Sequence, residues 1–211
     1  DYDIAVFTNL APEHIERHGS FEKYREAKLK LFQKVASKKT GIGVYNLDDE
    51  NVGFFLKYPM GKKYGYSLRP NTLSFGGREN LDYILRISNI QVSPRGTEFE
   101  IGSIHFETKL LGHFNVYNIA AAICVAISQK VEIQTIKEAL VKARSAPGRL
   151  EVVEAGQNFT VIVDYSYEAT SLENALKAVD NIDNLTGAGK NPLEGLLGSL
   201  GSFNDANRMS L

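Results

Sequence analysis

Residues 4–35 read IAVFTNLAPEHIERHGSFEKYREAKLKLFQKV, and this stretch decides the fold class. It opens with Ile4–Phe7, a short apolar run typical of a buried strand. A polar loop around His14 follows, and beyond Phe21 apolar residues recur at the spacing of an amphipathic helix. A strand that runs through a loop into a helix is the repeating unit of α/β folds, so we expect an α/β protein.

The remainder of the chain continues this pattern. Between Tyr83 and Leu110, short alternating runs separated by the turn Ser93–Gly96 predict an antiparallel hairpin or meander. Further strands are expected at Gly41–Asn46, Lys63–Ser67, Glu151–Ala155 and Phe159–Val163. Helices are expected at Phe21–Ser37, Phe54–Tyr58 (a short helix or turn), Asn115–Gln129, Ile133–Ala143 and Ser171–Val179.

Composition limits the classes of function. The chain has 211 residues, 43% of them hydrophobic, which is enough to bury a core. Its formal net charge of −1 gives no reason to expect a nucleic-acid partner or binding to an anionic membrane surface. We find no signal peptide and no apolar stretch long enough to span a bilayer, so we expect a cytoplasmic protein. The single cysteine, Cys124, lies in an apolar run and is expected in the core.

Lys28 is the first candidate for a functional side chain. It stands in the middle of the expected apolar stripe of its helix, which consists of Phe21, Tyr24, Leu31, Phe32 and Val35. A bare ammonium on a buried helix face is costly unless it is paired or modified. Carbamylation by CO2 would turn the amine into an anionic oxygen ligand suited to Mg2+, with the imidazole of His14 nearby. The alternative is a lysine stem that snorkels to solvent and a surface histidine.

Two further segments carry polar residues beside expected elements. Asn46 and Asp49 follow a strand in the wording NLDD, where the alternative is a turn that ends the strand. Phe114 and Asn115 lie in LGHFNVYNIAAA (residues 111–122), where Asn115 is placed to cap the helix that follows. Each pattern is explained in large part by local structure.

Two more segments lie in the last third of the chain. Arg149 follows the turn pair Pro147-Gly148 in SAPGRLE, between expected helices and expected strands, and its alternative is a solvated arginine. Asp164 ends a strand in DYSYEA, the usual location for a ligand-binding loop in an open α/β sheet. Its alternative is an aspartate that caps the next helix.

In this order and spacing, these segments resemble the ATP-dependent Mur ligases, which build the peptide stem of bacterial cell-wall precursors. The wording around His14 and Lys28 resembles most the members that add the third residue of the stem. The resemblance implies that His14 and carbamylated Lys28 hold Mg2+. It also implies that Arg149 reaches the ATP phosphates across a cleft and that Asp164 lies beside nucleotide and metal. A guanidinium suits phosphate because it is always charged and binds in a bidentate way.

The same resemblance implies a nucleotide site. Asn46 and Asp49 match a family segment near the adenine, the position of Phe114 lies against the adenine, and Asn115 borders the nucleotide. Two later positions depart from the family pattern: Tyr167 replaces a histidine and Ala169 replaces a proline. The first puts any role of that histidine in doubt. No glycine-rich loop ending in Gly-Lys-Ser/Thr occurs in these 211 residues.

The resemblance also implies the domain organisation. We expect residues 1–147 to be the later part of a Mur ligase central ATPase domain, with a mixed sheet, helices and a small antiparallel sheet. Residues 148–211 are expected to begin a Rossmann-like C-terminal domain and to end in an irregular tail. Because the chain opens inside a core strand without a methionine, we expect further residues upstream.

The implied activity is amide-bond formation through an acyl phosphate. ATP and Mg2+ would be the cofactors, and a UDP-N-acetylmuramoyl-peptide and an amino acid would be the substrates of a monomeric enzyme. We expect the chain as printed to be inactive alone. Two alternatives remain open: a ligase similar to the folylpolyglutamate synthases, and a truncated, non-catalytic remnant of a Mur ligase.

Overall fold

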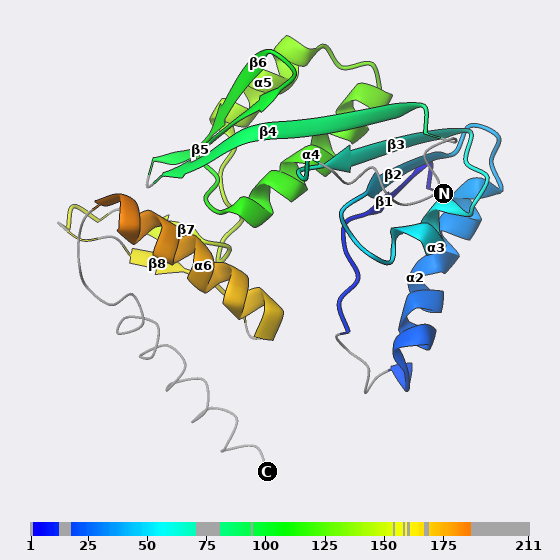
Figure 1. The fold of residues 1–211 in the computed structure, drawn as a ribbon, viewed down its shortest axis with the longest axis horizontal. Helices are drawn as coiled ribbons and strands as arrows, with labels where there is room; N and C mark the ends of the chain where they lie inside the picture. Colours follow the sequence, from blue (N-terminus) through cyan, green and yellow to red (C-terminus); the bar gives the residue numbers. More distant parts are fainter. Residues whose placement is uncertain are drawn as a thin grey trace.

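The computed structural model describes residues 2–12, 18–70, 81–93, 95–153, 155–157, 159, 161–166 and 169–186. Helices and strands alternate along the first half of the chain, as expected for an α/β protein (Figure 1). The strands are β1 (Ile4–Phe7), β2 (Ile42–Asn46), β3 (Lys62–Ser67), β4 (Tyr83–Ser93), β5 (Gly96–Ile101), β6 (Ile104–Thr108), β7 (Glu151–Val153) and β8 (Val161–Val163). The helices are α2 (Phe21–Ala36), α3 (Val52–Leu56), α4 (His113–Ser128), α5 (Ile133–Lys142) and α6 (Ala169–Thr186).

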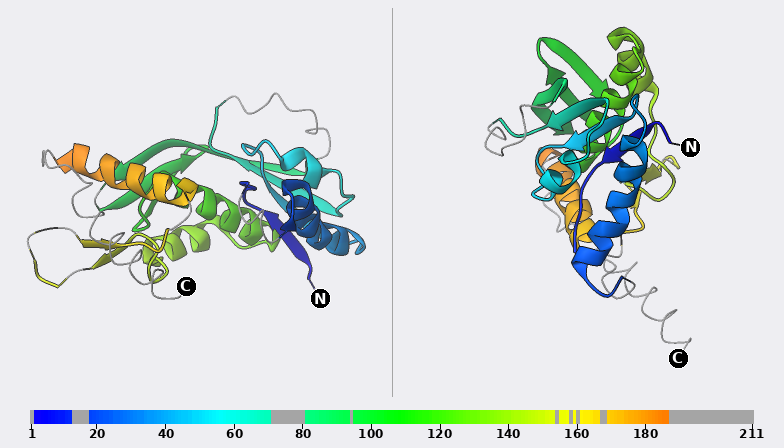
Figure 2. Two further views of the ribbon diagram at one scale, coloured as in Figure 1. Left: turned by 90° about the horizontal axis from the view of Figure 1, so that it is seen from below. Right: turned by 90° about the vertical axis from the view of Figure 1, so that its right-hand side faces the viewer.

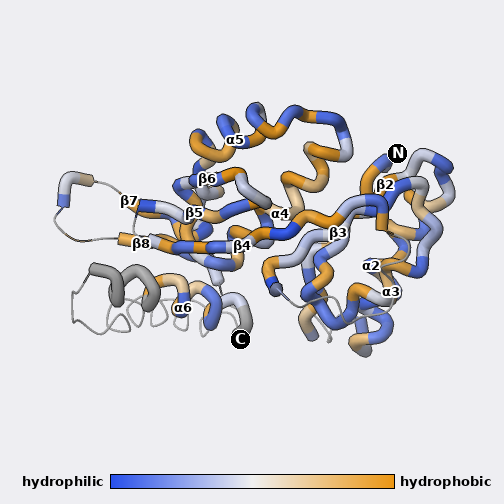
Figure 3. The backbone as a smooth tube through the Cα atoms, turned by 45° about the horizontal axis from the view of Figure 1, so that its top comes forward, coloured by the Kyte–Doolittle hydropathy of each residue, from blue (hydrophilic) through white to orange (hydrophobic). Residues whose placement is uncertain are grey.

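Strand β4 joins two kinds of sheet. The main sheet has six strands in the order β1-β2-β3-β4-β5-β6. Strands β1 to β4 are parallel to one another, whereas β4, β5 and β6 form the antiparallel meander that the sequence predicts. The register of β4 shifts between Ser88 and Gln91, beside Asn89 with its φ of 51°. The meander therefore continues the parallel sheet rather than forming a sheet of its own. Along β4, hydrophobic and hydrophilic residues alternate (Figure 3).

The main sheet is covered on both faces, as its parallel part requires. Successive residues of a strand point to opposite faces, so Val44 and Tyr45 of β2 enter different cores. Val44 packs in a cluster with residues of α4 and α5, whereas Tyr45 packs with Phe32 of α2 and Phe55 of α3. The views in Figure 2 show these helices along the sheet. Cys124 of α4 is fully buried, which confirms the expected core position.

Helix α2 is buried over its C-terminal half only. Ser20 caps it by accepting a hydrogen bond from the Lys23 amide, and Phe32 and Val35 are buried. Lys28 is exposed and Leu31 is 36% exposed, so the prediction that Lys28 sits in the middle of a buried face is wrong. The reason is geometric, because the N-terminal half of α2 extends beyond the sheet (Figure 1).

Helix α4 begins earlier than the sequence indicates. Its N-cap position is Gly112, with φ 88°, and its first residue is His113. Asn115 therefore lies inside the first turn, and the prediction that it caps the helix is wrong. Its side-chain amide donates instead to the Leu111 carbonyl at 2.7 Å, which fastens the loop before the helix to the helix itself.

The last described elements form a small separate layer. Strands β7 and β8 pair antiparallel, and both are shorter than predicted. Helix α6 is longer than predicted. It packs against the preceding part of the chain through a third buried cluster, which consists of Leu111, Leu150, Ala175 and Ala178. Pro147 and Gly148 lie between α5 and β7, so the boundary at residue 147 stays a prediction. Of the irregular tail expected over residues 182–211, residues 182–186 belong to α6 and residues 187–211 lie outside the described residues.

Candidate functional site at the carboxyl ends of the parallel strands

Asn46 and Asp49 tie the end of β1 to the end of β2. Asn46 is buried, and its side-chain amide donates to the Thr8 carbonyl at 2.7 Å. The Asp49 carboxylate accepts from the Leu10 amide at 3.0 Å. These bonds fix the segment that leads from β1 towards His14, which itself lies outside the described residues. The expected turn is also present, because the Asn46 side-chain oxygen accepts from the Asp48 amide at 3.0 Å.

Lys28 extends into solvent beside an aromatic ring. Its Nζ lies 5.3 Å from the centroid of the Tyr24 ring. It forms no ion pair with any residue that the structure describes. Within the same residues, no group of three or more His, Cys, Asp or Glu side chains is placed to hold a metal ion. A carbamate on this amine would add the oxygen ligands that Mg2+ prefers, but it would form on an exposed side chain rather than in the buried position that the sequence suggested.

Asp48 joins the strand ends to α4, a role that sequence reasoning missed. One carboxylate oxygen accepts from the Ser67 hydroxyl at 2.6 Å. The other accepts from the Leu68 amide at 2.8 Å and from the Tyr117 hydroxyl at 3.1 Å. Burial, with a contribution from the Asp48 carboxylate, raises the pKa of Tyr117 to about 12. Asp48 lies within the NLDD segment (residues 46–49), but its hydrogen bond to Tyr117 depends on the fold.

Phe114 lies near the C-terminal layer. Its ring is half-buried against the cluster that contains Leu111 and Leu150. Asn115, on the same turn of α4, accepts from the Asn118 side chain at 3.2 Å in addition to its bond to Leu111. The structure therefore places Phe114 beside the residue that follows Arg149 in sequence.

Arg149 and Asp164 are brought together through the backbone. The Asp164 carboxylate accepts from the Leu150 amide and from the Ser166 amide, both at 2.8 Å. The Arg149 side chain is exposed and, among the described residues, forms no ion pair. A solvated guanidinium and an anion-binding guanidinium both fit this geometry.

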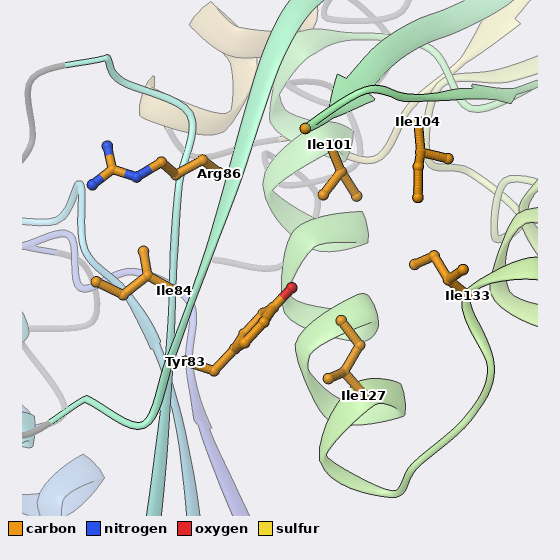
Figure 4. A pocket seen from close by; sticks show the side chains of 8 residues that line it. Tyr83, Ile84, Arg86, Ile101, Ile104, Ile127 and Ile133 are labelled. Atoms are coloured by element: carbon orange, nitrogen blue, oxygen red, sulfur yellow. The ribbon is translucent and has the colours of Figure 1, made fainter.

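A separate hollow of about 480 Å3 lies away from these residues. It is mainly apolar, and Figure 4 shows Ile101, Ile104, Ile127 and Ile133 turned towards one another. None of the site residues expected from the sequence lines it. In the part of the chain that the structure describes, no helix is long and apolar enough to cross a membrane.

The fold and the site together define a class. Polar side chains converge at the carboxyl ends of parallel strands β1, β2 and β3, which is where open α/β proteins bind their ligands. The chain is thus an α/β protein with a candidate ligand site at that edge of its sheet.

Comparison with known proteins identifies the family. Residues 1–126 match the model of the Mur ligase middle domain, and the chain belongs to the Mur ligase family. It is 38% identical over 187 residues to the UDP-N-acetylmuramoyl-L-alanyl-D-glutamate–2,6-diaminopimelate ligase of Geobacillus thermodenitrificans. It is 39% identical over 187 residues to the ligase of the same name from Geobacillus kaustophilus. Each alignment covers 85% of this chain, and the chain spans about 36% of the length of these relatives.

Solved structures agree in fold. A structure of a UDP-N-acetylmuramoyl-L-alanyl-D-glutamate–2,6-diaminopimelate ligase matches with a TM-score of 0.67 and 33% identity, over 85% of this chain and 36% of that one. MurF from Acinetobacter baumannii matches with a TM-score of 0.69 and 20% identity, over 85% of this chain and 37% of that one. The second likeness concerns the fold alone. Together they confirm the α/β class expected from the sequence.

Proposed function

We propose that the protein containing these residues is an ATP-dependent ligase that joins an amino acid to a UDP-N-acetylmuramoyl-peptide during cell-wall synthesis. The observation that carries the proposal is the 38–39% identity to diaminopimelate ligases over 187 residues. These relatives also favour this activity over that of a folylpolyglutamate synthase.

The reaction proceeds in two displacements. The terminal carboxylate of the peptide attacks the γ-phosphorus of ATP, forms an acyl phosphate and releases ADP. The amine of the amino acid then attacks the acyl carbon, loses a proton and expels inorganic phosphate. Such steps depend on positioning and on neutralising phosphate charge, which cations supply.

In this proposal His14 and Lys28, the latter carbamylated, hold Mg2+. The sequence motif around His14 and Lys28 supports this assignment, which does not depend on burial of the Lys28 side chain. Asn46 and Asp49 assist by fixing the segment Thr8–Leu10, which leads to His14. Magnesium, when bound, supplies charge neutralisation at the transferring phosphate.

The proposal also includes a nucleotide site. Asn46, Asp49, Phe114 and Asn115 would border the base and ribose, and Arg149 would contact the phosphates. Asp164 supports Arg149 through its bond to the Leu150 amide. We further propose a monomer that works in the cytoplasm.

The test uses the full-length protein with ATP, Mg2+ and UDP-N-acetylmuramoyl-L-alanyl-D-glutamate. Incubation with diaminopimelate, and in parallel with lysine, is expected to yield ADP, phosphate and one extended peptide with one of the two amino acids, detected by mass spectrometry. Lys28→Ala should abolish product formation, and an excess of a short carboxylic acid should restore part of it by replacing the carbamate. Absence of any product from the wild-type protein would favour the non-catalytic remnant.

A further inference from the structure

In the turn that carries Arg149, the backbone N–H groups of Gly148, Arg149 and Leu150 all donate hydrogen bonds. The Gly148 amide donates to the Glu151 carboxylate at 2.8 Å. The Arg149 amide donates to the Ala146 carbonyl at 3.0 Å, and the Leu150 amide donates to Asp164 at 2.8 Å. Three successive N–H groups therefore have partners, which leaves the backbone of this turn little freedom.

The turn also adopts a costly conformation. Gly148 has φ 69° and Leu150 has φ 44°, and a leucine rarely adopts a positive φ. The Tyr165 ring covers Gly148 so closely that an added Cβ would lie 2.3 Å from it, and the Tyr165 amide donates to the Gly148 carbonyl at 2.9 Å. Such a conformation persists only where the surroundings enforce it. Here the carboxylates of Glu151 and Asp164 are anchors on either side of Arg149.

We propose that Glu151 is a positioning residue for Arg149: by accepting the Gly148 N–H, it keeps the turn in the form that presents the guanidinium to solvent. This inference rests on the proposed function, in which Arg149 contacts the ATP phosphates. A guanidinium whose backbone is already fixed loses less freedom on binding phosphate, so Glu151 strengthens that contact without touching the nucleotide.

A double-mutant cycle in the full-length protein tests the inference through kcat/KM for ATP. Glu151→Ala is expected to lower this quantity about tenfold, the usual effect of losing one hydrogen bond to a charged group. Glu151→Gln should keep most of it, since an amide oxygen also accepts the Gly148 N–H. In an Arg149→Ala background, Glu151→Ala should cause no further loss, because its effect acts through Arg149. Fully additive losses would overturn the proposal.

A second readout does not need ligase activity. Trypsin cleaves after Arg149 only when the turn opens, so Glu151→Ala should speed this cleavage about tenfold, while Glu151→Gln should not. Glu107→Ala, on an exposed carboxylate of β6, is the matched control and should change neither readout. A wild-type protein without ATP turnover would refute the proposed function alone. Equal cleavage of wild type and Glu151→Ala would refute the role of Glu151.

Discussion

At the scale of single residues, two fully buried tyrosines on neighbouring strands differ in one hydrogen bond. The Tyr66 hydroxyl donates to the Phe7 carbonyl at 3.3 Å, whereas the Tyr45 hydroxyl has no partner among the described residues. Burial raises the pKa of both phenols well above its usual value, so both stay neutral. A buried hydroxyl without a partner keeps its desolvation cost.

We therefore expect opposite effects from one chemical change. Tyr45→Phe should raise the free energy of unfolding by about 1 kcal/mol, and Tyr66→Phe should lower it by about 1 kcal/mol. Urea unfolding followed by circular dichroism measures both. Equal destabilisation by the two variants would mean that the Tyr45 hydroxyl has a partner after all.

At the scale of elements, two glycines differ in whether the surrounding backbone leaves room for a side chain. Gly96 begins β5 with φ 142°, and an added Cβ would lie 2.0 Å from the Thr108 carbonyl oxygen of β6. Gly53 lies in α3, where an added Cβ would meet nothing within 4 Å. Gly96→Ala should cost about 2 kcal/mol or more of stability, because it forces β5 from β6.

Gly53→Ala is the matched control and should stabilise the protein by about 0.5–1 kcal/mol, since alanine favours a helix. Thermal unfolding of both variants gives the comparison. Wild-type stability in Gly96→Ala would show that the β5–β6 pairing can shift to admit a side chain.

At the scale of the whole molecule, the cluster of Leu111, Leu150, Ala175 and Ala178 connects α6 to the main body. Leu111→Ala removes a buried side chain from this cluster and should weaken the docking of α6 by about 3 kcal/mol. Hydrogen exchange is expected to speed up in α6 and to stay unchanged in β2 and β3. Leu31→Ala, on the exposed part of α2, is the control and should leave α6 unchanged. Equal acceleration in β2 and β3 would show that the protein opens as one unit.

The sequence predicts the elements of this molecule better than it predicts contacts. Apolar runs placed β1 and β2 within one residue of their observed limits, because local patterns determine them. Lys28 was misplaced because the helical wheel shows which residues share a face but not how far the sheet extends beneath it. Asn115 was misplaced because Gly112 starts α4 without a side-chain cap.

The site was predictable only in part for the same reason. The spacing of short motifs indicated Asn46, Asp49, Arg149 and Asp164, and the structure shows what their side chains or backbones bind. The Asp48–Tyr117 bond joins residues 69 positions apart, and the Glu151 contact with Gly148 depends on a turn whose φ angles no local pattern reveals. Such contacts require the assembled fold.

The double role of β4 also has a consequence for folding kinetics. The pairings of β4 with β5 and of β5 with β6 close short hairpins, whereas the parallel pairs of β1, β2 and β3 require crossovers through helices or loops. Local contacts form before distant ones because closing a short loop loses less chain entropy. The meander is therefore the expected nucleus, and the free edge of β4 then serves as the template on which β3, β2 and β1 assemble in turn.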